Sequence, residues 1–323
     1  MPAMPDFSAA EPTQAAAPFW RPCPGCQSIL HVPTLLKDSL RLVRCCDCGL
    51  CFANPVPPSC ANGSYYTEAA PYYLSPEKLA GDYAPVRFAR ELRLFRRHCP
   101  KGSVLDVGCS TGGFLHALRS RYAGEYDARG MDVSGPALDY AEKQGLTVER
   151  APFLDHNFGG QQFDAVTLWA VLEHVAEPHR FVAKAAELLR PGGHCFILVP
   201  NYRSLAVRLL GGRYRYVMPE HLTYFDSGTF RRFLERAPAL ALVDLRTLHF
   251  NPVVLWQDWR GRGGSAAPEQ RARLLQRTNA WKTSALLAPL RLGYAATERF
   301  LQTFGLADNL VAVLRQRSEA TAR

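Results

Sequence analysis

The sequence predicts an α/β fold with a mostly parallel sheet, preceded by a small cysteine-rich module. Three observations carry this prediction. Short apolar segments alternate with amphipathic ones along the middle of the chain, a glycine-rich turn follows the first of them, and two cysteine pairs lie near the N-terminus. With 323 residues, 47% of them hydrophobic, the chain is long enough for one sizeable core and one small appended module.

The composition limits the classes of function. The formal net charge is +9, from 38 basic and 29 acidic side chains, but these charges are scattered, which does not favour a nucleic-acid partner. Charged residues interrupt every apolar run before it reaches the roughly 18 residues of a membrane span. Residues 1–20 are rich in Ala and Pro and lack the pattern of a secretory signal. We therefore expect a cytoplasmic protein with a disordered N-terminal tail.

Two C-x-x-C pairs, separated by 18 residues, predict a structural zinc ribbon over residues 21–60. Each tight turn brings two thiolates to one side, and two such turns supply the tetrahedral cage that Zn²⁺ prefers. A four-thiolate cage leaves no coordination position for water, so the metal would support the fold and not catalysis. The predicted ligands are Cys23, Cys26, Cys45 and Cys48.

Cys46 and Cys51 lie close enough to compete as ligands, but only Cys45 with Cys48 keeps the two-residue gap, so the roles of Cys46 and Cys51 stay open. From Phe52 to Pro85 the chain is dense in Pro, Tyr, Asn and Ser, which predicts an irregular linker over residues 61–84, with the domain boundary near Tyr83. A helix is expected from Pro85 to His98, at the start of a larger domain over residues 85–323.

A strand, a glycine turn and a helix follow in sequence. Ser103–Val107 is apolar, Gly108–Gly113 contains three glycines, and Phe114–Arg121 is amphipathic. Glycines let the backbone turn sharply and let a ligand lie against it. A lone glycine loop is weak evidence, because dinucleotide-binding enzymes use a similar one.

Two acids make the prediction of a nucleoside site stronger. Asp106 ends the first strand, and Asp132 lies 26 positions later in a second strand, Arg129–Val133. An acid in that position can accept both ribose hydroxyls of a nucleoside. Two other interpretations stay open: Asp106 caps the turn, and Asp132 caps the helix expected from Gly135 to Gln144.

Successive segments resemble the motifs of class I S-adenosylmethionine-dependent methyltransferases, in the family's order, over residues 85–250. The resemblance is strongest to the ubiquinone-biosynthesis O-methyltransferases and to bacterial methyltransferases with an N-terminal zinc ribbon, including sugar C-methyltransferases. It implies a Rossmann-like, mostly parallel seven-stranded sheet with an antiparallel edge hairpin. The segments are Leu105–Gly112, Asp132, Phe163–Val166, Leu172–Val175, Leu188–Gly193 and Phe196–Asn201.

The resemblance also implies where S-adenosylmethionine binds: the turn holds its methionine part, Asp132 its ribose, and the segment after the third strand its adenine. Ser110 replaces the middle glycine of the family's loop. Ala151–Phe153 replaces an acid that many relatives have beside adenine, so we expect packing by Phe153 and backbone hydrogen bonds there. The expected cofactor-binding residues are Asp106, Gly108, Cys109, Ser110, Gly112, Asp132, Val133, Phe153 and Trp169.

Methyl transfer to a hydroxyl group needs alignment and a base that removes the proton. Glu173 and His174 follow the fourth strand, Phe163–Leu168, at the carboxyl edge of the sheet, where open α/β folds bind ligands. In the ubiquinone-type relatives, the corresponding Glu-x-x-Glu-His carries a divalent metal. Here the first acid is Ala170, which argues against a catalytic metal.

His221 is the first candidate for the base, followed by His174, with Glu173 as the third catalytic candidate. The segment Pro219–Phe225 matches the family's Glu-His-Leu stretch at the acceptor pocket, and a histidine titrates near neutrality. Other interpretations stay open. His174 could be a packed core histidine, and His221 could be hydrogen-bonded to the backbone at the start of the helix Ser227–Arg236.

The C-terminal part predicts an edge hairpin with a long insertion. Leu240–Phe250 and Asp308–Arg315 have strand patterns, and residues 252–306 between them are too long for a hairpin loop. Helical spacing in Arg271–Gln276 and Ala285–Phe304 predicts a helical insertion that could form a lid over the acceptor. Its basic and apolar residues would also suit a membrane surface, but core packing is the favoured interpretation.

Together these features predict an S-adenosylmethionine-dependent methyltransferase with a structural zinc, acting on a small-molecule or sugar acceptor. O-methylation is preferred, and C-methylation of a sugar or secondary metabolite is the alternative. A nicotinamide-dependent oxidoreductase is disfavoured because the loop lacks G-x-G-x-x-G. A zinc-ribbon nucleic-acid-binding module with a degenerate cofactor fold is disfavoured by the intact Asp106, Gly108, Gly112 and Asp132. The acceptor and the oligomeric state are not fixed by these patterns.

Overall fold

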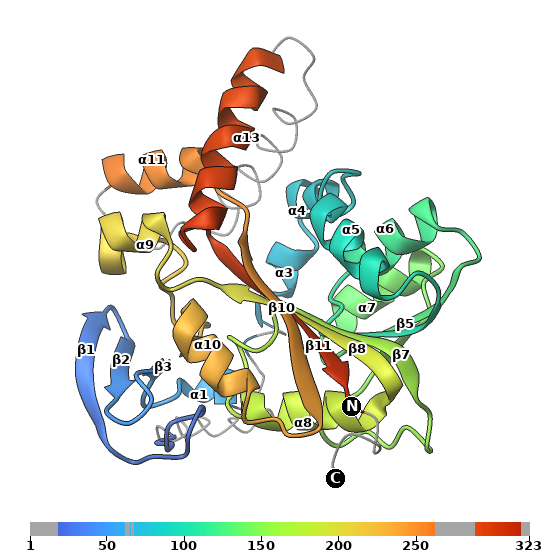
Figure 1. Ribbon diagram of the computed structural model, residues 1–323, viewed down its shortest axis with the longest axis horizontal. Coiled ribbons are helices and arrows are strands. Elements are labelled where there is room, and N and C mark those ends of the chain that lie inside the picture. The colour runs from blue at the N-terminus through green and yellow to red at the C-terminus, as the bar shows by residue number, and fades with distance from the viewer. Residues whose placement is uncertain (1–18, 62–64, 66–67, 262–287, 318–323) are drawn as a thin grey trace, which may run out of the picture.

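The computed structural model describes residues 19–61, 65, 68–261 and 288–317, and its centre is a seven-stranded sheet between two layers of helices (Figure 1). The strand order is β10-β11-β8-β7-β4-β5-β6. The five strands from β8 to β6 are parallel to one another, and β10 and β11 are antiparallel at one edge. Their bounds are β4 Gly102–Val107, β5 Tyr126–Asp132, β6 Val148–Arg150, β7 Phe163–Trp169, β8 Leu189–Pro200, β10 Leu240–Leu248 and β11 Asn309–Gln316. The predicted fold class and its edge hairpin are confirmed.

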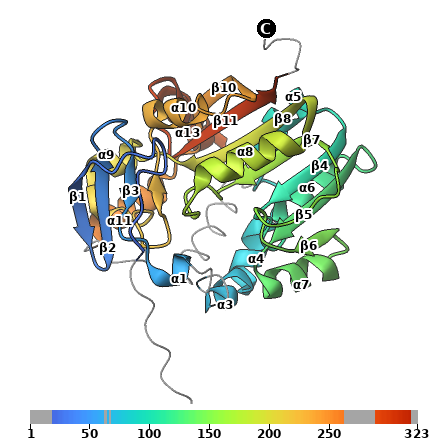
Figure 2. The same ribbon diagram turned by 90° about the horizontal axis from the view of Figure 1, so that it is seen from below.

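Alternating side chains along the strands build a core on each face of the sheet. On β11, Val311 and Val313 pack with α5 (Ala89–His98) and α6 (Gly113–Arg121), whereas Leu310, Ala312 and Leu314 belong to the core shared with the opposite helices. Those opposite helices are α8 (Pro178–Leu188) and α10 (Ser227–Leu234), and Figure 2 shows α8 lying along the sheet. The helix α7 (Gly135–Lys143) packs beside α6.

The cysteine-rich module is a small antiparallel sheet that takes its last strand from the larger part of the chain. The strand order is β1-β2-β3-β9, with β1 His31–Lys37, β2 Leu40–Cys45, β3 Cys51–Ala53 and β9 Thr223–Tyr224. Cys51 pairs with Tyr224, and Phe52 pairs with Thr223. The module lies beside α9 (Leu205–Leu210) and α10 in Figure 1. The segment directly after His221 is therefore part of the module's sheet.

The expectation of an irregular linker over residues 61–84 is wrong for its described part, which contains α3 (Ala70–Tyr73) and α4 (Pro76–Asp82) after the short α1 (Pro58–Ala61). A local signal was present: the Ser75 side chain accepts a hydrogen bond from the Lys78 amide, and Pro76 follows as the first helical residue. The helix expected from Pro85 begins only at Ala89.

Two helices of the expected C-terminal insertion are described, α11 (Pro252–Arg260) and α13 (Ala288–Thr303), while the helical spacing in Arg271–Gln276 falls outside the described residues. A 3₁₀ turn, Gly211–Arg213, follows α9.

The expected disordered tail also lies largely outside the described residues, which begin at Phe19, and Phe19 pairs with Val56. Among the described residues, no helix is long and apolar enough to cross a membrane.

Candidate functional site

The glycine turn between β4 and α6 adopts left-handed backbone at three positions. Gly108 has φ +70°, Gly112 has φ +80°, and Ser110 between them has φ +49°. A Cβ on Gly108 would lie 2.6 Å from Cγ2 of Val171, so only glycine fits there. The Ser110 amide donates a hydrogen bond of 2.8 Å to Oδ2 of Asp132.

Asp132 ties the turn to the second strand. Its Oδ1 accepts a hydrogen bond of 2.8 Å from the Ser134 amide, while Oδ2 accepts the one from Ser110. Burial raises the pKa of Asp132 against the lowering effect of these backbone hydrogen bonds. The N-cap of α7 is Ser134, so Asp132 does not cap that helix. Its carboxylate lies at the carboxyl edge of the sheet, as a ribose-binding acid would.

Asp106 is buried at the end of β4 and accepts a hydrogen bond of 2.6 Å from the hydroxyl of Thr167 on β7. Burial raises its pKa to about 7, and the neighbouring Asp132 adds to this rise. Tyr83 also contacts the glycine turn, which the sequence did not indicate. Its hydroxyl donates a hydrogen bond to the Thr111 carbonyl at 2.5 Å, and its ring contacts the ring of Tyr140.

The other expected cofactor residues differ in their surroundings. Cys109 is buried beneath the turn, and Val133 is half exposed after Asp132. The ring of Phe153 is buried against Phe181 of α8, with 5.3 Å between ring centroids. Phe153 thus faces the helical core, and adenine packing by this ring stays a prediction.

Trp169 ends β7, and its ring packs against Phe114 and Phe196. Its indole Nε1 is buried and has no hydrogen-bond partner among the described residues, and the same is true of the Ser134 hydroxyl. Buried polar atoms are normally satisfied. Together with Gly108 and Gly112, where a Cβ would collide with Val171 and Leu146, these two orphaned groups fit a site that a polar ligand completes.

The fold brings Glu173, His174 and His221 together, as expected for an acid–base site. The imidazole centroids of the two histidines lie 4.7 Å apart with the rings nearly perpendicular. One carboxylate oxygen of Glu173 lies 3.9 Å from Nε2 of His174. Backbone hydrogen bonds join the segment of Glu173 and His174 to the segment that follows His221. The Glu173 carbonyl accepts hydrogen bonds from the amides of Leu222 at 2.6 Å and Thr223 at 3.1 Å.

The proton positions in this cluster follow from its partners. Nδ1 of His174 lies 2.9 Å from the Glu220 carbonyl, which can only accept, so Nδ1 carries the proton and Nε2 is the basic nitrogen. Glu173 is only 1% exposed, and burial raises its pKa to about 8. His221 is buried as well. One carboxyl and two imidazoles, with ligand atoms within 4.8 Å of one another, could also hold a divalent cation.

The four cysteines of the predicted zinc ribbon lie together, with all sulfur atoms within 4.8 Å of one another. The sulfur atoms of Cys23 and Cys48 are 3.5 Å apart, and those of Cys26 and Cys45 are 3.4 Å apart. A tetrahedral Zn²⁺ with Zn–S bonds of about 2.3 Å separates its sulfurs by about 3.8 Å, so the set fits this ion. Outside this cluster, Cys46 is exposed and Cys51 is buried on β3.

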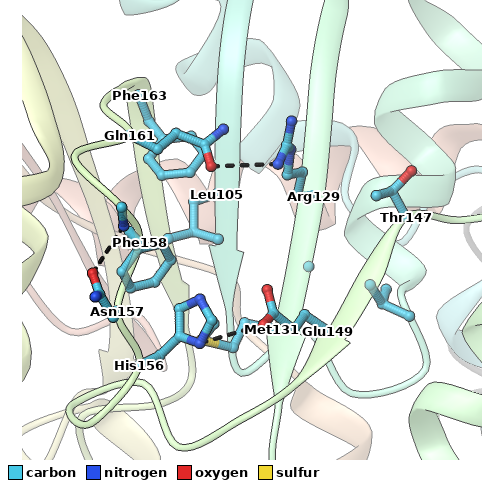
Figure 3. Close-up of a pocket in the computed structure, with 13 residues that line it drawn as sticks. Leu105, Arg129, Met131, Thr147, Glu149, His156, Asn157, Phe158, Gln161 and Phe163 are labelled. Carbon is cyan, nitrogen blue, oxygen red and sulfur yellow. Dashed lines mark hydrogen bonds and ion pairs between the residues drawn. The ribbon is translucent and has the colours of Figure 1, made fainter.

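A pocket of about 460 Å³ lies on the face of the sheet at β5 and β6. Leu105, Met131 and Phe163 line it from the strands, and Asn157, Phe158 and Gln161 line one side of it (Figure 3). Arg129 donates a hydrogen bond to Gln161, and both residues line the pocket. None of its lining residues belongs to the expected cofactor or catalytic set.

Comparison with known proteins decides the family. A family model described as "Methyltransferase domain" matches residues 82–237. The ubiquinone biosynthesis O-methyltransferase of Proteus mirabilis is 30% identical over 197 residues, which cover 54% of this chain and 78% of that protein. The chain belongs to the class I S-adenosylmethionine-dependent methyltransferases. Membership implies S-adenosylmethionine as the methyl donor and confirms the enzyme class predicted from the sequence.

Two further likenesses are to a second relative and to a solved structure. The ubiquinone biosynthesis O-methyltransferase of Burkholderia thailandensis is 26% identical to this chain over 178 residues, which cover 48% of this chain and 72% of that protein. The solved structure of the cyclase SpnF has a TM-score of 0.51 and 17% identity, and covers 81% of this chain and 97% of its own. At that identity the likeness shows the fold alone, and a fold does not decide the reaction.

Proposed function

We propose that this methyltransferase transfers a methyl group to a hydroxyl oxygen of a small-molecule or sugar acceptor, with His221 as the base. The observation that carries the proposal is the cluster of Glu173, His174 and His221 at the carboxyl edge of the sheet. The loop that leads to this cluster lies against the glycine turn, since Val171 contacts Gly108. A base beside the cofactor loop is what hydroxyl methylation needs.

S-adenosylmethionine supplies a methyl group on a sulfonium, and the residues proposed to hold it are those of the glycine turn together with Asp132. The protein's own part is to orient the acceptor and remove its proton. Because burial keeps Glu173 protonated near neutral pH, its carboxyl group adds no negative charge beside the imidazoles. An imidazole nitrogen of His221 can then accept the hydroxyl proton, while His174 is held in one tautomer by the Glu220 carbonyl.

The preference for oxygen over carbon is supported by the relatives, which are named as O-methyltransferases. The test is transfer from S-adenosylmethionine labelled in its methyl group to a panel of catechols, such as 3,4-dihydroxybenzoate, and of nucleotide-linked sugars. We expect the label in a methyl ether of one class, and its loss in His221→Ala. Label bonded to an acceptor carbon would replace the proposal with C-methylation.

We also propose that Cys23, Cys26, Cys45 and Cys48 hold one structural zinc ion. The sulfur separations and the two C-x-x-C turns support it. In this proposal residues 21–60 are the zinc ribbon and residues 85–323 the catalytic domain, with the insertion at about 252–306.

A further inference from the structure

Arg21 lies where the cysteine module meets the catalytic cluster. Its side chain is buried, with 6% exposure, and its guanidinium donates hydrogen bonds to two backbone carbonyls. One carbonyl belongs to Ala176 and the other, at 2.6 Å, to Leu222. Ala176 follows Glu173 and His174 along the chain, and Leu222 directly follows His221. One side chain thus joins the two segments that carry the catalytic candidates.

The module holds Arg21 in this position. The Asn54 side chain accepts a hydrogen bond from the Arg21 amide and donates one to the Arg21 carbonyl, both at 3.1 Å. The guanidinium carbon lies 5.6 Å from the centroid of the Phe52 ring. Phe52 is on β3 and pairs with Thr223 of β9, so the arginine and the segment that it binds are fixed to the same small sheet.

We propose that Arg21 is a positioning residue that sets the separation between the Glu173–His174 segment and His221. The inference rests on the proposed function, in which His221 removes the acceptor proton. A planar guanidinium can reach two carbonyls at once with a fixed geometry, which a lysine ammonium on a flexible stem cannot reproduce. In this arrangement the cysteine module acts as a support for the catalytic cluster, although it supplies no group to the reaction.

The test compares full-length, zinc-loaded Arg21→Met with Arg232→Met. Arg232 is a matched control, because it also joins the module to the catalytic part, through a 2.8 Å hydrogen bond to the Cys48 carbonyl, but is exposed. We expect Arg21→Met to speed hydrogen exchange of the Leu222 and Thr223 amides by about tenfold or more. We expect kcat to fall by about 10- to 100-fold and the Kd for S-adenosylmethionine to stay within about twofold. The control should match the wild type.

A second variant, Arg21→Lys, keeps the charge and covers the case in which Arg21→Met does not fold. It should recover part of the lost kcat. Unchanged hydrogen exchange of the Leu222 and Thr223 amides in both variants would show that Arg21 does not hold this segment. Faster exchange with unchanged kcat would show that Arg21 holds the segment but does not position the catalytic residues. Activity in His221→Ala would instead refute the proposed base. The exchange measurement needs only the protein, so the two failures are distinguishable.

Discussion

At the residue scale, Asp132 shapes the turn, and we propose that it also binds the ribose of S-adenosylmethionine. Its carboxylate holds the Ser110 and Ser134 amides at 2.8 Å each. We expect Asp132→Ala to weaken S-adenosylmethionine binding by about 1.5–3 kcal/mol, since charge-assisted hydrogen bonds to both ribose hydroxyls are lost. Calorimetric titration measures this change. Asp139→Ala, at an exposed acid on α7, should bind like the wild type, and equal affinity in both variants would remove Asp132 from the cofactor site.

His221 should govern the chemical step without affecting cofactor binding. We expect His221→Ala to lower kcat by about 10²–10⁴-fold at saturating acceptor, with the Kd for S-adenosylmethionine nearly unchanged. Steady-state kinetics at saturating acceptor and calorimetric titration of the cofactor measure these two quantities.

The control for this substitution is His179→Ala, at an exposed histidine of α8, which should keep wild-type kcat. A His221→Ala enzyme that retains more than about a third of wild-type kcat would move the role of base to His174. The tautomer of His174 supports it as this second candidate, because its Nε2 is left basic.

Glu173 should make the stability of the fold depend on pH. Its folded-state pKa is about 8, above the ordinary value of 4.5, because of burial. Between these values the folded protein holds a proton that the unfolded chain has released, so the free energy of unfolding decreases as pH rises through this window. We expect Glu173→Gln to show a smaller decrease between pH 5 and 8 in denaturant titrations. Glu142→Gln, at an exposed position, should keep the wild-type slope.

At the scale of single elements, local patterns predicted the strands and helices that surround the glycine turn. Ser103–Val107 and Gly135–Gln144 were expected within a residue of the observed β4 and α7, because apolar spacing and glycines are local signals. The two-residue strand β9 was not expected, since its pairing with β3 depends on residues distant in sequence. A strand of two residues is too short to show an alternating pattern of apolar and polar side chains in the sequence.

The cysteine cluster allows a prediction at this scale. We expect about one zinc ion per chain, and its loss in Cys45→Ser, because Cys45 supplies one of four converging sulfurs. Cys46→Ser changes the adjacent, exposed cysteine and should keep the metal. Elemental analysis of protein purified without chelator measures the content. Loss of zinc in both variants, or its absence from the wild type, would contradict the proposed ligand set.

At the scale of the whole molecule, the sequence indicated the residues of the Glu173–His174–His221 cluster better than the contacts that hold them. Glu173, His174 and His221 were found through motifs, because the family resemblance covers the segments that carry them. Arg21 has no motif around it, and its partners Ala176 and Leu222 offer only backbone carbonyls. Any residue type presents such a carbonyl, so no pattern of side chains could have indicated the contact.

The shared core also predicts how the molecule unfolds. Val43 and Phe52 of the module belong to the same buried cluster as Phe225 and Phe230 of the catalytic part, and β3 pairs with β9. Elements that share a core and a sheet unfold together, so we expect a single cooperative transition in denaturant. Zinc release, read with a coloured chelator, should have the same midpoint as the loss of S-adenosylmethionine binding. Release of zinc at a clearly lower denaturant concentration, with cofactor binding intact, would show that the module is an independent unit and would also remove the support that Arg21 requires.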